Sequence, residues 1–483
     1  IFSRDDKKMK RERVNESASL LDVDSKKTGG WEAGLHMIKG NLGPGCLNLP
    51  CAFAQAGAMT SAIAMAAVAI QGIYCMWLVA KCKHAIVKEQ NRHSDSNDEL
   101  VVTLMDLAEF AFGKSGRIAV QALLIIMQGG VCCVFIALVS DNLQGTVDPN
   151  HDTLSHLEAV SIVVFVLIPL SLLRFISSLK FVSVLGNLLM LLAVSTAVGF
   201  GSSVIAKTHP KSEPKEITLS RVSVLISSLY YAFEGIALVL PVENSMRRSQ
   251  TFPRVLVLSM GLLGLLFVLV GTVCSSAFPL LSEGSITAYL VKNYSENLWF
   301  QTVNILVTVS VLLTYPLQLF PVVEAFDSCG NGSCRKKDHR SLNNSLELDE
   351  EDRAVYSESI RSSSFWQRRG WVFKRLFYTF LFAAVAASVS HLDQLVALFG
   401  AVGTTGLVIV PCVIHLRLNH LGIVPVNLFV VLWHILVILF CCSVMVIGTI
   451  KAVENILNDR TTIMYFNYTN ATNAMLNDSL VRI

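Results

Sequence analysis

The chain has 483 residues, of which 53% are hydrophobic and only 16% are charged, and its formal net charge is +3. A soluble domain carries about 25% charged residues, so this composition excludes an ordinary soluble protein. Apolar segments of about 20 residues recur with short gaps between them, which predicts one integral bundle of membrane helices and not several soluble domains.

The chain begins with a charged segment that has no apolar signal-peptide core, and residues 1–30 are interpreted as a disordered cytosolic tail. A single transmembrane domain is predicted over residues 31–457, followed by an extracytosolic tail over residues 458–483. The eleven predicted spans are residues 32–55, 58–82, 117–143, 157–174, 176–206, 221–245, 253–279, 298–325, 370–389, 392–417 and 423–455.

Loop charge predicts the orientation of these spans. With a cytosolic N-terminus, most loop Lys and Arg residues fall on the cytosolic side, as the positive-inside rule requires. Glycosylation sequons in the loop after the seventh span and in the C-terminal tail then fall outside the cytosol. The asparagines of these sequons are Asn293, Asn467, Asn470 and Asn477. No address in the sequence distinguishes the plasma membrane from a vacuolar or lysosomal membrane.

Two further segments are not predicted to cross the bilayer. Residues 101–116 place apolar side chains at helical spacing together with Asp106 and Glu109, which predicts a cytosolic interfacial helix leading into the third span. Residues 327–369 are rich in Ser, Asn and charges of both signs, which predicts a disordered cytosolic loop.

The first span contains helix breakers at membrane depth. Residues 36–50 read HMIKGNLGPGCLNLP, with three glycines and a proline between positions 40 and 45. Backbone that leaves the helix inside a membrane is tolerated only where it is buried in protein or lines a water-filled cavity. The sequence therefore predicts a break that faces such a cavity.

The sixth span has a matching interruption. Residues 227–241 read SSLYYAFEGIALVLP, with Glu234 and Gly235 at the centre. Interrupted helices at corresponding positions of two halves are typical of inverted-repeat transporters. Each interrupted span opens a block of five spans, and an odd number makes the second block run in the opposite direction. For either break alone, the alternative is the higher frequency of Gly and Pro in membrane helices.

The two breaks offer complementary chemistry. A half-helix that begins near Cys46 presents free N–H groups and the positive end of its dipole, which suit a carboxylate. Carbonyl groups freed between Ala232 and Glu234 accept hydrogen bonds from an ammonium group. Together the two ends predict a site for a zwitterion.

Four motifs carry a family resemblance. HMIKGNLGPGCLNLPCAFAQAG (36–57), YAFEGIALVLPVENSM (231–246), GSIT (284–287) and LTYPLQLFP (313–321) are similar to elements of the amino acid/auxin permease family, in its proton-coupled amino acid transporter branch. The resemblance covers about residues 31–457. It implies an eleven-helix fold of the leucine-transporter type and proton-driven uptake of amino acids.

One position departs from the family pattern. Pro44 stands where the family usually has a small Thr or Ser. The departure affects the position of the break and the substrate preference. The predicted substrate-binding residues are Gly40, Asn41, Gly43, Gly45, Cys46, Ala232, Phe233 and Gly235.

Glu234 and His36 are the predicted proton-coupling residues. An ionisable group inside a span marks a functional site, and burial favours the protonated form of a carboxyl group. The alternative for Glu234 is a structural carboxylate that ties the broken ends together. His36 shares a helix face with Gly40 and Gly43, and the alternative for it is a plain interhelical hydrogen bond. Lys39 either neutralises Glu234 or extends toward the interface.

Hydroxyl groups in the eighth span are candidate ligands for a sodium ion. Thr308, Ser310 and Thr314, together with carbonyl groups of the first span, match the sodium site of related transporters, although hydroxyl groups are also common in packed membrane helices. Three aromatic residues flank the second break: Tyr230, Tyr231 and Phe233. Their side chains either line the pocket or pack in the core.

These observations predict a symporter that moves small neutral amino acids with protons by alternating access. The alternatives are a sodium-coupled amino acid transporter and a membrane sensor of the same fold that binds amino acids without flux. No motif of a membrane enzyme is present. The predicted partners are an amino acid, a proton and the lipid bilayer. Neither a cofactor, nor a resident metal other than sodium, nor a nucleic acid is expected.

Overall fold

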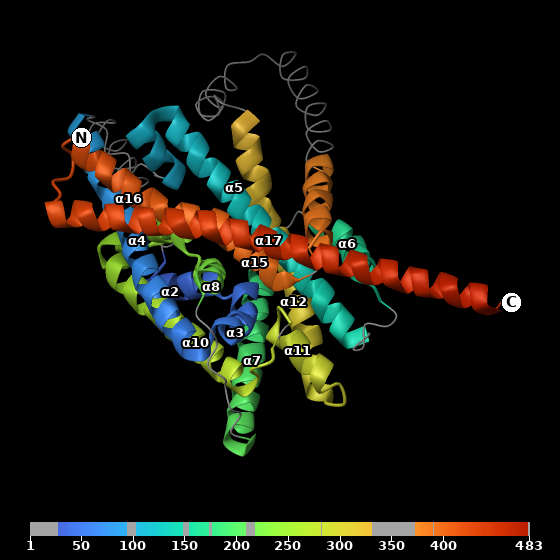
Figure 1. Cartoon of the computed structure of the whole chain (residues 1–483). Helices are drawn as coiled ribbons and strands as arrows, with labels where there is room; N and C mark the ends of the chain where they lie inside the picture. The colour runs from blue at the N-terminus through green and yellow to red at the C-terminus, as the bar shows by residue number, and fades with distance from the viewer. Residues whose placement is uncertain are drawn as a thin grey trace, which may run out of the picture.

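The structure is a computed structural model that describes residues 28–93, 103–147, 154–172, 176–208, 218–281, 283–330, 372–389 and 391–481. Within these ranges, regular structure is helical apart from one isolated bridge between Thr28 and Met246. Figure 1 shows the resulting all-helical bundle. The predicted fold class is therefore confirmed at this level.

The helices follow the predicted order along the chain. The first half contains α2 (Gly30–Asn41), α3 (Pro44–Ala56), α4 (Ala58–His93), α5 (Leu104–Val147), α6 (His156–Ser171) and α7 (Ile176–Thr208). Next come α8 (Leu219–Ala232), α9 (Ile236–Ser245), the 3-10 turn η1 (Ser249–Thr251), α10 (Phe252–Ala277), α11 (Ile286–Asn293) and α12 (Leu298–Gly330). The last part contains a helix over 372–387, α15 (Leu392–Phe399), the π turn η3 (Gly400–Thr404), α16 (Thr405–His420) and α17 (Leu428–Val481).

The described residues contain eight helices that are long and apolar enough to cross a membrane, fewer than the eleven predicted. The other three predicted spans correspond to shorter helices. The first is divided into α2 and α3, α6 has 16 residues, and the described part of the ninth covers 372–387. A helix rises about 1.5 Å per residue, so 16 residues reach only about 24 Å across a hydrocarbon core of about 30 Å.

Both predicted interruptions are present. The first lies at Leu42 and Gly43, between α2 and α3. Pro44 is the first residue of α3, where its missing N–H costs no helical hydrogen bond. The second interruption covers residues 233–235, between α8 and α9, with Gly235 at the N-cap of α9.

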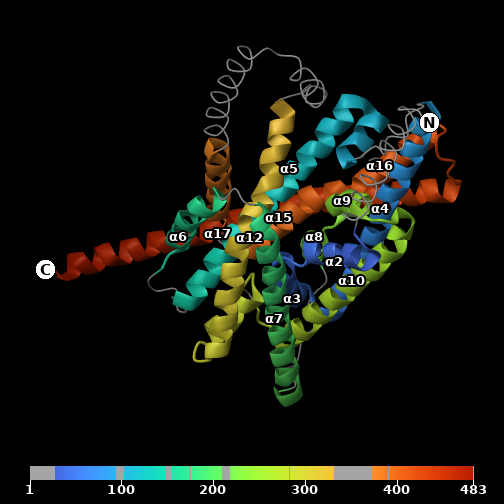
Figure 2. The ribbon, with the colours of Figure 1, turned by 180° about the vertical axis from the view of Figure 1, so that it is seen from behind.

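The two interrupted spans lie side by side and run in opposite directions. α3 packs against α8 and α2 packs against α9, so the first half of each span contacts the second half of the other. At the crossing, a Cβ atom on Gly45 would lie 2.9 Å from Ala232 Cα, so only glycine permits this approach. Figures 1 and 2 show α2, α3 and α8 together within the bundle.

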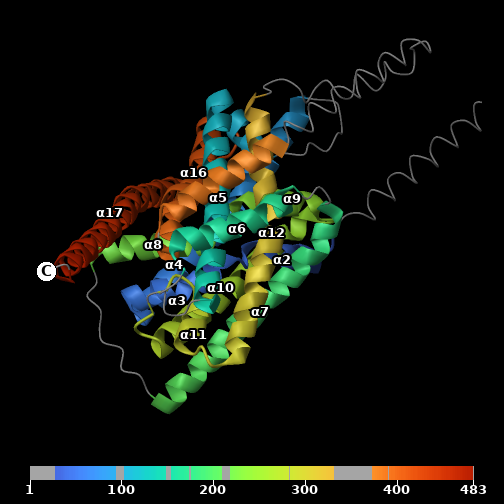
Figure 3. The same cartoon turned by 90° about the vertical axis from the view of Figure 1, so that its right-hand side faces the viewer.

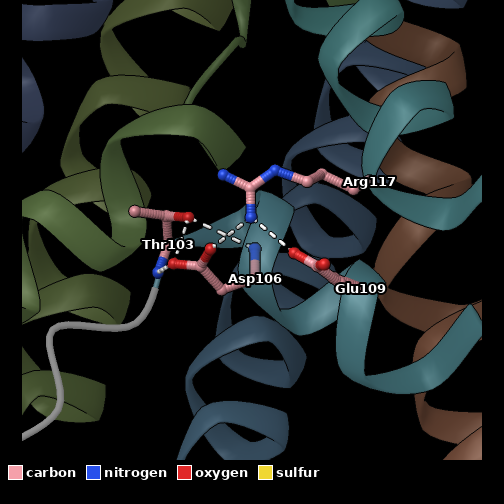
Figure 4. A network of polar contacts seen from close by, with 4 residues as sticks. All are labelled: Thr103, Asp106, Glu109 and Arg117. Carbon is pink, nitrogen blue, oxygen red and sulfur yellow. Dashed lines mark hydrogen bonds and ion pairs between the residues drawn. The ribbon is translucent and has the colours of Figure 1, made fainter. Parts of the chain in front are cut away.

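The predicted interfacial helix and the third span are joined in α5 by a kink at Gly113, whose φ is +68°. Glycine adopts this left-handed backbone without the clash that a Cβ atom causes. The short helix before the kink is held by Arg117, which donates to Asp106 at 3.0 Å and to Glu109 at 2.5 Å (Figure 4). Asp106 also accepts the hydroxyl hydrogen bond of Thr103 at 2.7 Å.

The tenth predicted span is not one regular helix. Residues Gly400–Thr404 form a π turn between α15 and α16, and the Thr405 hydroxyl donates to Gly400 O at 2.8 Å. A Cβ atom on Gly400 would clash with Ser227 O of α8, so the irregular turn allows α15 and α8 to approach closely.

The predicted tails and the predicted loop 327–369 contain residues that the structure describes. Thr28 belonged to the predicted tail, but its N–H donates to Ser245 O at 2.8 Å; residues 1–27 lie outside the described residues. The predicted loop 327–369 begins with four residues of α12, and residues 331–369 lie outside. The segment predicted as an extracytosolic tail, 458–483, continues α17 as far as Val481.

Helix α17 lies at the side of the bundle and its C-terminal part extends beyond the other helices (Figures 1 and 3). It packs against α16, α15 and α8. Its outward face is apolar and exposed, as at Phe429 and Leu439, which is typical of a surface that contacts lipid.

Candidate functional site

A cavity of about 380 Å³ lies where the two interrupted spans meet. Its walls come from the two interrupted spans, that is α2, α3, α8, α9 and both breaks, and from α5, α7 and α12. The cavity thus joins segments that are up to about 280 residues apart in the chain. A cavity of this size is in the range of small-molecule sites.

The first break lines the cavity with backbone. Gly40, Asn41, Gly43 and Gly45 all border it, as predicted. Gly43 is extended, and a Cβ atom there would meet no heavy atom within 4 Å, so the chain leaves open space at this point. Cys46 is buried outside the cavity lining, because α3 begins two residues earlier than predicted.

The N-terminus of α3 has no side-chain cap, since its N-cap is Gly43. The Cys46 N–H was predicted to be free, but it donates to Gly43 O at 3.1 Å. The positive end of the α3 dipole still lies at the cavity wall formed by Gly43, Pro44 and Gly45.

Asn41 holds an unpartnered acceptor at the cavity. Its side-chain nitrogen donates to Met37 O at 2.8 Å and lies 3.8 Å from Met260 Sδ. Its side-chain oxygen is buried and accepts no hydrogen bond from the described residues. A buried acceptor without a partner costs about 1–3 kcal/mol, which a bound donor would recover.

The second break contributes Glu234 to the cavity lining, and Ala232, the last residue of α8, also borders the cavity. Two neighbouring residues that were predicted to bind substrate face other helices. Phe233 packs against Gly72 and Gly264, and Gly235 contacts Met76. The direction of each side chain here depends on how the backbone leaves the helix. The spacing of residues in the sequence does not predict that path.

Glu234 is half-buried and forms no hydrogen bond or ion pair with any other residue that the structure describes. His36 and Lys39 of α2 line the same cavity. Neither is paired with Glu234 in the described part of the chain. The structure therefore brings the predicted coupling residues to one cavity and leaves the carboxyl group open to it.

The opposite wall was not predicted from the sequence. Gln128 of α5, Asn187 of α7 and Gln318 of α12 line it, and Gln128 Nε2 donates to Gln318 Oε1 at 2.5 Å. These are polar residues inside apolar spans, which is the signal that would have found them. Gln318 also belongs to the LTYPLQLFP motif at 313–321.

The three predicted sodium ligands are separated by the structure. Ser310 and Thr314 line the cavity, one turn apart on α12. Thr308 does not, and its hydroxyl donates to Asn304 O at 2.7 Å within the same helix. The Thr314 hydroxyl donates to Ser310 O at 3.0 Å.

Polar contacts join α3 to segments far along the chain. Asn48 donates to Gly284 O at 3.0 Å, and Gln55 donates to Asp393 at 3.0 Å. Among the residues of α2 that line the cavity, His36 and Gly40 are exposed.

Another polar cluster lies at the end of α9, away from the cavity. Glu243 is 1% exposed and is bonded to His84 and, at 3.4 Å, to Lys83 of α4. Both of these partners come from α4. The carboxylate fastens α9 to α4.

Fold and cavity together define the class: an α-helical, multi-pass integral membrane protein that encloses a solute-sized cavity between two interrupted helices. The chain belongs to the transmembrane amino acid transporter protein family, whose model matches residues 26–454. The predicted resemblance is thereby confirmed, and membership places the chain among transporters and not among enzymes.

Curated relatives are distant. Vacuolar amino acid transporter 4 of Saccharomyces cerevisiae is 26% identical over 405 residues, covering 80% of this chain and 52% of that protein. The proton-coupled amino acid transporter-like protein pathetic of Drosophila melanogaster is 25% identical over 318 residues, covering 62% of this chain and 64% of that protein. Vacuolar amino acid transporter 3 of Schizosaccharomyces pombe is 25% identical over 295 residues, covering 60% of this chain and 42% of that protein. The chain thus spans about half the length of the curated relatives it matches.

Among solved structures, MhsT in complex with L-phenylalanine is similar with a TM-score of 0.49 and 11% identity, covering 87% of this chain and 98% of that chain. This similarity is too low to carry an inference about the site.

Proposed function

We propose that this protein is a symporter that moves small neutral amino acids together with protons by alternating access. The observation that carries the proposal is the pair of interrupted helices that lie antiparallel at one cavity. The carboxyl group of Glu234 lies in the cavity wall and has no partner among the described residues. Family membership and the name of the Drosophila relative, which is described as proton-coupled transporter-like, support it.

In the proposed binding mode, the substrate carboxylate lies at the N-terminus of α3. Gly43 leaves space for it, and no protein side chain caps this helix end. The ammonium group then meets acceptors at the second break and the free side-chain oxygen of Asn41. The remaining predicted binding positions, Gly40 and Gly45, contribute backbone and space.

Glu234 is the proposed proton carrier. It is the cavity-lining carboxyl group of the second break, and an ionisable group at membrane depth is typical of a proton pathway. Glu234 takes up a proton from one side of the membrane and releases it to the other. Protonation removes the charge of the carboxyl group, which lowers the electrostatic cost of enclosing it together with the zwitterion while access to the cavity changes sides. His36 is the proposed second group, because it is exposed and lines the same cavity.

The proposed architecture has eleven spans, with two inverted blocks of five and α17 as the eleventh. It has a cytosolic tail over 1–30, a transmembrane domain over 31–457 and an extracytosolic segment over 458–483. Asn293, which is exposed at the end of α11, and the sequons of the last segment are then available for glycosylation. The names of two yeast relatives favour a vacuolar or lysosomal membrane over the plasma membrane.

Uptake into proteoliposomes tests the proposal. The purified full chain is reconstituted at neutral internal pH and presented with labelled L-alanine, with and without an acidic exterior and with and without sodium. We expect uptake that requires the pH gradient, ignores sodium and is abolished by a protonophore. Binding of L-alanine without flux under every gradient would indicate a sensor.

Sodium coupling is the second candidate, because Ser310 and Thr314 line the same cavity. Hydroxyl oxygens are hard ligands of the kind that alkali and alkaline-earth cations prefer. Uptake that follows a sodium gradient at equal pH on both sides, and that falls in the Thr314→Val variant, would favour this candidate.

A further inference from the structure

The last turn of α8, which leads into the second break, is held from outside the cavity by α4 and α17. The Tyr230 hydroxyl donates to Gln71 Oε1 at 2.9 Å, and Gln71 Nε2 donates to Cys441 Sγ at 3.2 Å. Tyr230 Oη lies 3.7 Å from the same sulfur. Tyr230 is 1% exposed and Cys441 is fully buried, so protein encloses this contact.

Helix α17 approaches α8 a second time, one turn earlier. A Cβ atom on Gly448 would clash with the present position of the Ser227 hydroxyl, so the two helices are in close contact here. Ser227 and Tyr230 are three residues apart on α8, and Cys441 and Gly448 are seven apart on α17, so each pair shares a helix face. One face of α8 is therefore packed against α17, while the adjacent Tyr231 lines the cavity.

A parallel contact joins α4 to α17 without including α8. One turn beyond Gln71, the Tyr74 hydroxyl and His434 Nε2 are 2.9 Å apart. His434 is fully buried. This second contact resembles the first in chemistry and burial, and it provides a matched control.

We propose that Gln71, Tyr230 and Cys441 are positioning residues of the binding site: they fix the end of α8, and with it Tyr231 and the break that carries Glu234. The eleventh helix, which lies outside the two proposed blocks of five, thereby becomes part of the binding apparatus. The inference rests on the proposed transport activity for its kinetic readout. It predicts that loss of the contact lowers the fraction of molecules competent to bind.

Transport kinetics test the positioning role. In proteoliposomes with labelled L-alanine, we expect Gln71→Leu to raise the apparent KM about two- to tenfold, with Vmax changed less than about twofold. Tyr230→Phe is expected to act in the same direction. The double variant should raise KM by less than the product of the single effects, because it leaves no unpaired partner.

Tyr74→Phe is the matched control and should leave KM near the wild-type value. An equal rise in KM in Tyr74→Phe would show a general loosening of the α4–α17 contact and would overturn the inference. A Gln71→Leu variant with unchanged KM would overturn it as well.

Amide hydrogen exchange gives a readout that does not depend on transport. In the detergent-purified full chain without substrate, Gln71→Leu should speed exchange over residues 229–236 and leave α10 unchanged. Unchanged exchange over 229–236 would reject the positioning role. If the wild type takes up no L-alanine but exchange still responds, the proposed function fails and the positioning inference stands.

Discussion

The two breaks look alike in the sequence, yet they make different contributions to the cavity. The first consists of Leu42 and Gly43, is bordered by further glycines and offers open space beside exposed residues of α2. The second covers three residues, of which Phe233 and Gly235 pack against neighbouring helices and Glu234 faces the cavity.

This difference assigns different chemistry to each break. Glycine-rich backbone at the first break presents main-chain groups and room for a ligand, because no side chain occupies the space. At the second break, the ring of Phe233 is packed tightly against neighbouring helices and cannot move. This packing fixes the backbone, and with it the position of the adjacent carboxyl group of Glu234. Interrupted helices in a membrane thus serve either to expose backbone or to position one side chain.

Removal of the carboxyl group is the strongest test of this comparison. We expect Glu234→Gln to lose nearly all uptake of L-alanine driven by a pH gradient, since an amide cannot release a proton, while exchange of L-alanine at equal pH persists. Thermal unfolding should change little, because Gln has nearly the same volume. Uptake that keeps the wild-type dependence on pH in this variant would refute the assignment. His36→Ala serves as the comparison and should retain part of the gradient-driven uptake.

Crowding at the crossing point should have the next largest effect. Gly45→Ala places a methyl group 2.9 Å from Ala232 Cα, and backbone atoms cannot yield as a flexible side chain does. We expect a loss of about 1–3 kcal/mol in the free energy of unfolding. Differential scanning fluorimetry of the purified protein measures the shift, and a melting temperature equal to wild type would show that the two breaks are not in contact.

Gly43→Ala is the matched variant at the open position. Its methyl group enters free space, so we expect wild-type stability together with weaker binding of larger substrates. The apparent KM should rise about tenfold for L-alanine and less for glycine, as one methyl group in a confined site changes binding by about 1–3 kcal/mol. Equal effects on both substrates would place Gly43 outside the site.

The smallest effect is expected where α2 is tied to α9. The Thr28 hydroxyl donates to Ser245 O at 3.0 Å, in addition to the backbone bridge. Thr28→Val keeps the shape and removes this hydrogen bond, which should cost about 0.5–1.5 kcal/mol, whereas Thr28→Ser should retain most of it. Thermal unfolding of the three proteins side by side measures the difference, and identical values for Val and Ser would exclude a contribution of the hydroxyl.

Much of the fold could be predicted because membrane depth restricts the backbone so strongly. A run of about 20 apolar residues has few alternatives to a helix, and glycines, a proline or a carboxylate within such a run mark an interruption. The count of spans was less predictable. α6 is short, and α2 and α3 are separated, so length alone does not identify them as spans.

Side-chain direction at the second break could not be predicted. Ala232, Phe233, Glu234 and Gly235 are adjacent, and helical spacing no longer applies once the helix ends. Contacts with Gly72 and Gly264 decide that Phe233 faces away from the cavity.

The order of residues along the chain is enough to identify a helical membrane protein, its two interrupted spans and the carboxyl group within one interruption. Those features are local, because hydrogen bonding and hydropathy act within a few turns of one helix. The folded bundle was needed to show that Gln128, Asn187 and Gln318 form the opposite wall and that α17 holds the end of α8. Such contacts join residues from helices far apart in the chain, and their packing depends on the whole bundle at once.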